Sequence, residues 1–598
     1  MRINIDQNLF KHLIGHKVII RCTKIDSNGI FKTLITRVLK IGKFGFLVAL
    51  LNLNSGGPSY AQDRDDGDRT APSTRIERSL PQRAPKKTDE ALPSIEHQAP
   101  KQPSEPGAQK IIVAAVMVEG AEVFKAAEFA PLYEDMLAQT VTVEDLGALI
   151  EKITEKYHDA GYYLSQAFLP PQPLDLGVIR IRVVEGHFED VSFEGLDQPG
   201  RLAKKMAEKL GQERPARLET LERTMLLLGD TFGLIVDDAA IEELDPGSGR
   251  YRLRFILRQK RVYANAFLDN RGTESAGRTE LWTAVGLNRL WDTDTQVQAG
   301  VFTIPRQPQE LKYGEIRVAG NIGDAGTVIG GSVSASISDA GGEDAAFETE
   351  SESFRAGLRI AHPILRQRDN SLWINGLFEI NHVSEQEFGV DTFEDQVRAI
   401  RVNLNYTGTD PWGAGLYAFA EVSLGLNVLG ASEDDGPRSR FGADAEFRKF
   451  RFDLSRTQGL TDTFGLQLQV AGQIADDELL SSEEFGLGGS YIGRAYDFSE
   501  IAGDHGLGGS VELRYGRDLE KSYLKGYQLY GFYDIGAVWN DGEFETHQQT
   551  LASTGGGIRL TLPSSLRINL EYARALTRPV SSDGDKFERL FFSVSLDY

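Results

Sequence analysis

The sequence predicts an all-β transmembrane barrel of sixteen antiparallel strands that follows two small α+β domains. From residue 262 to the C-terminus, helical periodicity is absent and apolar residues alternate with polar ones in successive short runs. Such alternation marks strands with one apolar and one polar face, as a barrel between lipid and water requires. Between residues 111 and 259 a β-α-α-β-β order occurs twice, which predicts two small α+β domains in tandem.

The composition agrees with this fold and excludes other classes of protein. The chain has 598 residues and a formal net charge of -22, so we expect no binding to nucleic acid. Glycine occurs 62 times, above its average share of about 7%, as expected of many strands joined by tight turns. The single cysteine, Cys22, lies in a segment that we expect to be removed, so no disulfide is predicted.

Residues 1–61 are predicted to be a signal peptide. Four basic residues precede an apolar stretch at residues 45–53, and a small-x-small cleavage site ends at Ala61. This order is typical of an export signal; a short core helix is the alternative interpretation. The basic residues are Lys32, Arg37, Lys40 and Lys43. No later window approaches the roughly 18 apolar residues of a transmembrane helix, so strands must make any membrane crossing.

Residues 62–110 are predicted to be a linker. They are rich in proline and charged residues and poor in apolar ones, so they cannot bury enough surface to fold as a domain. Only residues 73–80 are compatible with a helix, and Pro81 ends that stretch. Proline removes a backbone donor and clashes with the preceding turn, so the helix could not continue.

The two α+β domains are predicted at residues 111–186 and 187–259. In the first domain we expect an apolar strand near Ile111, then helices at 127–137 and 143–160, and then strands that start at Tyr162 and Val178. Its second helix starts at Thr142 and has an apolar stripe made of Leu146, Leu149, Ile150 and Ile153. In the second domain we expect a strand from Glu189, then helices at 201–210 and 217–228, and then strands that start at Phe232 and Arg250.

Residues 260–598 are predicted to form the barrel. The sixteen strands are expected to start near residues 262, 278, 294, 312, 326, 353, 371, 395, 415, 440, 461, 508, 524, 551, 565 and 587. Acidic interruptions at 339–352 and 431–438 suit extracellular loops, and the short turn at 288–293 suits the periplasmic side. The last strand alternates through Phe592 and ends on Tyr598. A soluble β-sandwich is the alternative interpretation.

A glycine-rich loop at residues 485–510 carries the candidate functional residue. Arg494 lies between Gly493 and the pair Ala495 and Tyr496. In the strand predicted at 527–540, alternation places Asp534 on the face opposite Tyr533, Ile535, Ala537 and Trp539. If those residues meet lipid, Asp534 points into the lumen, where an arginine on an inward-folded loop could pair with it.

The loop and the strand resemble two motifs of the outer-membrane transporters of two-partner secretion, the TpsB family of haemolysin or haemagglutinin secretion and activation proteins. The resemblance rests on residues 493–496, on Gly503 and Asp504 behind them, and on the strand residues 532–536. In that family an Arg-Gly-Tyr or Arg-Gly-Phe loop tip lies inside a sixteen-stranded barrel, held by a wall aspartate. Ala495 stands where the family usually has glycine. Mature chains of that family begin with a helix that plugs the barrel, so the resemblance makes the helix-compatible stretch at 73–80 a possible plug helix within the linker at 62–110.

The two α+β domains are similar to POTRA domains, the periplasmic modules of the barrel-assembly superfamily; residues 161–163 and 184–186 carry this likeness. The resemblance implies an outer-membrane pore that captures a large secreted exoprotein, haemagglutinin- or haemolysin-like, and translocates it unfolded. It also implies outer-membrane lipid and the barrel-assembly machinery as partners, the latter recognising the strand with Phe592 and Tyr598. The alternatives are an assembly insertase with three to five POTRA domains and a passive porin or adhesin.

An edge strand in the first POTRA-like domain is the second candidate site. An extended client chain could add to it through backbone hydrogen bonds, unless the edge is covered. The residues concerned are Tyr162, Tyr163, Ser165, Ala167 and Leu169. No nucleophile motif, phosphate loop or metal-ligand spacing occurs, so we expect no enzyme, cofactor or metal site.

Overall fold

The computed structural model describes residues 95–96 and 110–598, except 175, 274, 343, 434–435, 520 and 543–544. The predicted signal peptide and the helix-compatible stretch at 73–80 lie outside the described residues. Among the helices of the described residues, none is both long and apolar enough to cross a membrane.

The first α+β domain is built on a three-stranded sheet. Its strands lie in the order β3 (Ala115–Glu119), β6 (Val178–Val184) and β5 (Gln166–Phe168). The short strands β2 (Ile111–Ile112) and β4 (Thr140–Val141) pair beside it. Helix α5 (Val143–Asp159) starts at Thr142, as predicted. The side chain of Thr142 accepts from the Asp145 N–H, and the Asp145 carboxylate accepts from the Thr142 N–H, which is a capping box.

Two predicted elements of this domain are wrong in detail. The helix expected at 127–137 consists of three short pieces, η3 (Ala126–Glu128), α4 (Ala130–Tyr133) and η4 (Glu134–Met136). Pro131 lies in the first turn of α4 and has no N–H to continue a helix from before it. The strand expected from Tyr162 begins only at Gln166, because residues 162–165 form a turn in which the Ser165 N–H donates to the Tyr162 carbonyl at 3.0 Å.

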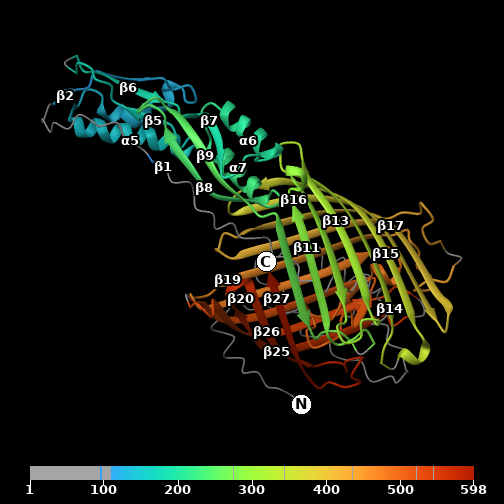
Figure 1. Cartoon of the computed structure of the whole chain (residues 1–598). Helices are drawn as coiled ribbons and strands as arrows, with labels where there is room; N and C mark the ends of the chain where they lie inside the picture. Colours follow the sequence, from blue (N-terminus) through green and yellow to red (C-terminus); the bar gives the residue numbers. More distant parts are fainter. Residues whose placement is uncertain are drawn as a thin grey trace, which may run out of the picture. The chain divides into compact units, whose positions relative to one another are not determined.

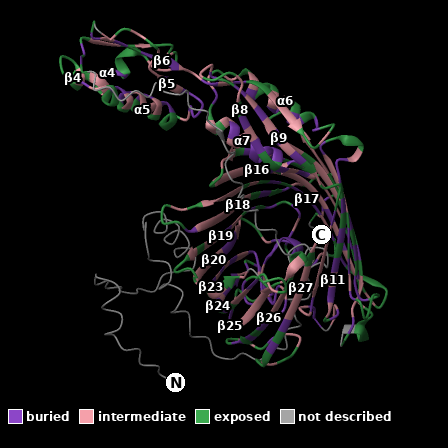
Figure 2. Cartoon of the chain, turned by 60° about the vertical axis from the view of Figure 1, so that its left-hand side comes forward, coloured by how far each residue is buried: buried purple, intermediate pink, exposed green. Residues whose placement is uncertain are grey.

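The second α+β domain has a larger sheet, in the order β1-β8-β9-β7. Buried residues gather where its helices meet the sheet (Figure 2). Its elements are β7 (His187–Glu194), α6 (Arg201–Gln212), α7 (Leu218–Asp230), β8 (Leu234–Glu243) and β9 (Arg250–Gln259). Strand β1 (Ile95–Glu96) pairs with β8 in parallel. The repeated α+β order is therefore confirmed.

Strands β10–β20 and β23–β27 close into one antiparallel barrel (Figure 1). The predicted number of sixteen strands is confirmed. The first eight are β10 (Val262–Asp269), β11 (Glu280–Asn288), β12 (Thr295–Thr303), β13 (Lys312–Ile322), β14 (Thr327–Asp339), β15 (Glu350–Arg366), β16 (Asn370–Glu387) and β17 (Val390–Thr409). The others are β18 (Gly415–Gly425), β19 (Arg448–Gly459), β20 (Phe464–Ala475), β23 (His505–Asp518), β24 (Gly526–Trp539), β25 (Gln548–Thr561), β26 (Leu566–Ala575) and β27 (Glu588–Asp597). Four 3-10 turns join them: η5 (Leu290–Asp292), η6 (Asp344–Phe347), η7 (Ser481–Glu483) and η8 (Pro563–Ser565).

The predicted strand start near residue 440 is wrong by eight residues, since β19 begins at Arg448. Arg440 is instead a buried loop residue, 7% exposed. The two faces of the strands differ as predicted. On β17, Ile400 and Val402 are 41% and 46% exposed, whereas Arg401 between them is 8% exposed. The apolar side chains therefore face outward, where lipid would cover them.

The second α+β domain is bonded to turns of the barrel. Asp294, just before β12, accepts from the Leu202 N–H at 3.0 Å and so caps α6, whose N-cap residue Gly200 has no side chain. Arg289 is fully buried and donates to Asp294 at 3.2 Å. In a second turn, Arg366 forms a two-pronged ion pair with Asp230 at 2.7 and 2.9 Å.

Candidate functional site

The loop between β20 and β23 forms a small hairpin of its own and contacts the barrel wall. Strands β21 (Phe485–Leu487) and β22 (Ile501–Gly503) pair as its two legs. At the tip, the Tyr496 N–H donates to the Gly493 carbonyl at 2.9 Å. Gly493 has φ of +92°, a conformation that favours glycine. The tip therefore has a defined turn that presents Arg494.

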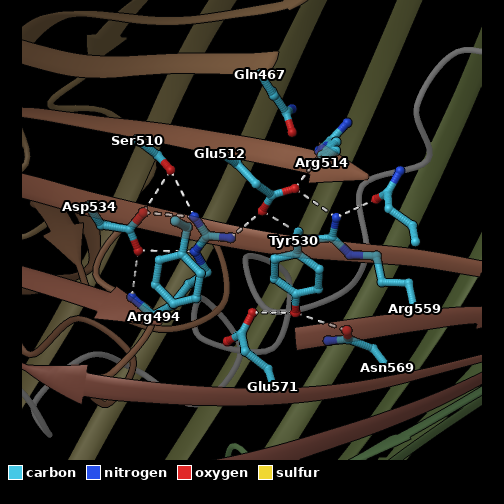
Figure 3. A network of polar contacts seen from close by, with 12 residues as sticks. Gln467, Arg494, Ser510, Glu512, Arg514, Tyr530, Asp534, Arg559, Asn569 and Glu571 are labelled. Atoms are coloured by element: carbon cyan, nitrogen blue, oxygen red, sulfur yellow. Dashed lines mark hydrogen bonds and ion pairs between the residues drawn. The ribbon is translucent and has the colours of Figure 1, made fainter. Parts of the chain in front are cut away.

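The structure brings Arg494 and Asp534 together (Figure 3). Arg494 Nε lies 3.0 Å from Asp534 Oδ2, and Nη2 lies 2.9 Å from Oδ1. The backbone N–H groups of Gly493 and Arg494 also donate to Oδ2, at 3.1 and 3.0 Å. Arg494 is 5% exposed and Asp534 is fully buried. The aspartate on β24 thus holds both the guanidinium and the backbone of the tip.

Three further partners of Arg494 were missed in the sequence. Glu512 on β23 accepts from Nη1 at 2.5 Å, and Ser510 accepts from Nη2 at 2.9 Å. The guanidinium also lies 3.6 Å from the ring centroid of Phe532, a cation–π contact. Alternation along β23 could have identified the first two, because Ser510 and Glu512 are two residues apart and share the lumen face.

Glu512 serves more than one cation. Arg514 Nε lies 2.6 Å from its Oε1, and Arg559 Nη1 lies 2.7 Å from the same oxygen (Figure 3). Next to them, Tyr530 donates to Glu571 at 2.7 Å. The wall around the tip is therefore a connected polar network, in which a change at Arg494 alters the partners of several other charges.

Tyr496 and Ala495 fix the tip on its other side. Tyr496 is buried, and its hydroxyl lies 3.1 Å from both the Ala552 carbonyl and the Thr577 hydroxyl. Ala495 is fully buried and its carbonyl accepts from Arg589 at 3.1 Å. Ala495 has a negative φ, so this position does not require the glycine that the family usually has there.

Gly503 and Asp504 lie at the base of the loop rather than at its tip. Asp504 is fully buried and accepts from Arg440 Nη1 at 2.6 Å. It also accepts from the backbone N–H of Leu479 at 2.8 Å, while Glu545 accepts from Arg440 Nε at 2.7 Å. This buried cluster joins the loop to two neighbouring connections of the barrel.

The start of the loop, just before β21, has a third attachment to the barrel wall. Glu483 is 3% exposed and pairs with Arg401 on β17 at 2.7 Å and with Lys449 on β19 at 2.6 Å. Lys449 also donates to the Glu483 carbonyl at 2.7 Å. No pattern in the sequence indicates this cluster, because glutamates are abundant and any one of them is uninformative.

The predicted edge of the first α+β domain differs from the expected site. Strand β5 is at the edge of its sheet, where it pairs only with β6. The side chains of Tyr162, Tyr163, Ser165 and Ala167 are buried and Leu169 is partly buried. The backbone of the three-residue strand is partly covered too, because the Ala167 N–H donates to the Thr154 hydroxyl on α5 at 3.0 Å. Among the described residues, no group of three or more His, Cys, Asp or Glu could hold a metal ion.

Comparisons with known proteins agree with this architecture. The family model described as haemolysin secretion/activation protein ShlB/FhaC/HecB matches residues 256–560, and the ShlB-type POTRA domain model matches residues 111–186. The heme/hemopexin transporter protein HuxB of Haemophilus influenzae is 22% identical over 476 residues, which cover 76% of this chain and 81% of that protein. The outer membrane transporter CdiB of Escherichia coli is 23% identical over 404 residues, covering 66% of this chain and 67% of that protein.

Two solved structures share the fold. CdiB from Escherichia coli has a TM-score of 0.66 at 20% identity and covers 85% of this chain and 94% of its own. CdiB from Acinetobacter baumannii has a TM-score of 0.58 at 16% identity, with coverage of 88% and 96%. This chain therefore shares its fold with both structures over most of its length.

Proposed function

Because the chain belongs to the ShlB/FhaC/HecB family of haemolysin secretion/activation proteins, we propose that it captures one large secreted exoprotein in the periplasm and passes it unfolded through its barrel. Family membership makes the protein an outer-membrane β-barrel transporter whose POTRA domains lie in the periplasm. The observation that carries the proposal is the buried pair of Arg494 and Asp534, which holds a loop against the inner wall of the barrel.

The pair acts as a lock on the pore. A chain can pass only if the tip of the loop leaves the wall, so transport requires that Arg494 and Asp534 separate. Separation leaves two charges to be rehydrated, which is costly in a dry site and cheaper once water enters. The closed state is thus favoured until a client supplies contacts of its own.

The first POTRA domain offers the client a place to start. Strand β5 lies at the edge of its sheet. A client chain that displaced Thr154 from the Ala167 N–H could pair with the backbone of this strand, which would accept many client sequences. Because Ser165 is fully buried, it cannot carry a crosslinker to a client. A photocrosslinking residue at Gln166 or Phe168 should capture a client chain during secretion, and one on α5 at Glu155 should not. Equal capture from both places would contradict the assignment of this edge.

The direct test of the function is co-expression with a candidate partner, a large haemagglutinin- or haemolysin-like exoprotein from the same genome. The exoprotein should reach the medium only when the transporter is present, and should remain in the periplasm without it. Release that does not depend on the transporter would contradict the proposal. An assembly insertase is a weaker candidate, since the described residues contain two α+β domains before the barrel, the first of which matches a POTRA model, rather than three to five.

A further inference from the structure

The turn between β11 and β12 has an unusual backbone conformation. Arg289, Trp291 and Asp292 have φ angles of +56°, +54° and +57°, in the left-handed region. A side chain with a Cβ disfavours this region, and a residue as bulky as tryptophan rarely adopts it. Strain of this kind persists only where surrounding contacts hold it, and such positions cluster at functional sites. Each of the three residues should therefore have contacts that hold it in place.

Two of the three residues are held by bonds to other parts of the chain. The Arg289 side chain is fully buried and donates to the Gln198 carbonyl, just before α6, at 2.6 Å. Asp292 pairs with Arg261, which lies between β9 and β10, at 3.0 Å. These bonds join the turn to the second α+β domain and to the segment that connects that domain to the barrel.

Trp291 is not held by burial within the protein. It is 88% exposed, the highest value among the large hydrophobic residues that the structure describes. It follows the outward-facing stripe of β11, in which Val285 and Leu287 are 52% and 44% exposed, whereas Trp282 on the inner face is 5% exposed. The turn lies at the mouth where β10 leaves the second α+β domain, which is the periplasmic end of the barrel. Aromatic rings close the lipid-facing band of a barrel at this level, because an indole ring has an apolar body and a polar N–H.

We infer that Trp291 inserts among the phospholipid headgroups of the periplasmic leaflet, and that the β11–β12 turn thereby attaches the second α+β domain to the membrane surface. The turn directs Arg289 into the protein and Trp291 away from it, and the lipid contact supplies the stabilisation that the left-handed tryptophan lacks within the protein. Movement of α6 away from the turn has to break the bond from Arg289 to Gln198 or draw the indole ring out of the leaflet. The membrane thus restrains the domain at one defined point, independently of any client.

Fluorescence quenching on the full chain in lipid nanodiscs tests the insertion. The signal of Trp291 is the part of the tryptophan fluorescence that Trp291→Phe removes. Phospholipids brominated close to the headgroup should quench this signal more strongly than phospholipids brominated at the ends of their acyl chains. Iodide in the buffer should quench it less than it quenches tryptophan in the unfolded chain.

Hydrogen exchange in the same nanodiscs tests the attachment of the domain. Trp291→Asn introduces a residue that tolerates the left-handed conformation but lacks the ring, and it should raise exchange in α6 about fivefold, which corresponds to about 1 kcal/mol. Trp291→Phe keeps an aromatic ring and should leave exchange near its original value. The matched control is Trp412→Asn, on the turn between β17 and β18 at the same mouth, where Trp412 is 64% exposed and its ring contacts Arg456 of β19. This control should leave exchange in α6 unchanged.

Each other outcome overturns the inference. Quenching by iodide but by neither brominated lipid would place Trp291 in water, and stronger quenching from the chain ends would place it in the hydrocarbon core. Unchanged exchange in α6 of Trp291→Asn, or an equal rise in Trp412→Asn, would show that the lipid contact does not restrain the domain. If Trp291→Asn does not insert into the membrane, Trp291→Gly takes its place, because glycine also tolerates a positive φ, and the same rise in α6 is then required.

Discussion

Replacing Arg494 by alanine should abolish or cripple secretion while leaving the barrel in the membrane. The change removes both prongs of the bond to Asp534 and the 2.5 Å bond to Glu512. Breaking a buried pair on one side costs about 3 to 5 kcal/mol, because the other charge is left buried. Asp534 keeps a hydroxyl donor in Ser510 at 2.7 Å, and Glu512 keeps Arg514 and Arg559. We therefore expect the lower end of the range, about 3 kcal/mol.

This loss acts on the equilibrium between the bound and the released loop. A change of about 3 kcal/mol shifts that equilibrium by roughly a hundredfold, so a tip that was almost always bound becomes frequently released. A pore with a released tip should conduct ions more often in planar bilayers, yet it should no longer place the loop correctly for a client. Arg494→Lys, which keeps the charge but not the two-pronged geometry, should give an intermediate phenotype.

The assay is the fraction of exoprotein in the medium, measured together with the amount of heat-modifiable barrel in the outer membrane. Secretion should fall at least tenfold with Arg494→Ala at an unchanged barrel level. Arg359→Ala, a wall arginine bonded to Asn375, is the matched control and should secrete normally. Full secretion by Arg494→Ala would refute the reasoning, as would an equal loss in the control.

Three further predictions test the surroundings of the lock. Glu483→Gln leaves Arg401 and Lys449 without their shared carboxylate, so channel openings in bilayers should become more frequent with the Arg494 pair intact; unchanged openings would count against this attachment. Asp294→Ala removes the cap of α6 and the ion-pair partner of the buried Arg289, so it should cost more than the roughly 1 kcal/mol of a lost cap, seen as faster hydrogen exchange in α6 than in α7; equal exchange in both helices would contradict it. Burial and the nearby Arg214 lower the pKa of His187 below 6.5. As the pH falls below about 6.5, the unfolded state therefore binds a proton at His187 more readily than the folded state does, and the second domain should lose stability until the pH passes the lowered pKa. His187→Gln should remove that pH dependence from the exchange of β7, and a variant that keeps it would exclude His187 as the cause.

The barrel was predictable because lipid outside and water inside require apolar and polar side chains to alternate with a period of two along every strand. Alternation also explains why a strand was wrongly predicted to start near residue 440. The residues around Arg440 are folded against Asp504 and Glu545, so they alternate without facing lipid and imitate a strand. Short apolar segments of the first domain failed for another reason: the turn at 162–165 is fully packed, and burial gives the same apolar pattern as a strand.

For the site, the sequence led to Arg494 and Asp534 because each is conspicuous in its own segment. Ser510 and Glu512 could have been found by alternation along β23. The other contacts of the loop tip involve ordinary residues from distant parts of the chain, which only the closed barrel brings together. Arg271, for example, precedes Arg494 by more than two hundred residues. Charged residues are abundant in this chain, so a contact of that kind has no local signal that could separate it from the background.

The loop is attached separately at its start (Glu483), its tip (Arg494) and its end (Asp504), and this limits how far a freed tip can travel. Arg494 is eleven residue steps from Glu483 and ten from Asp504, so a fully extended tip reaches about 37 Å from one anchor and about 34 Å from the other. A tethered arginine stays at a high effective concentration near its aspartate. If the tip leaves the wall during secretion, as proposed, we therefore expect it to rebind quickly after each passage, without a search through bulk water.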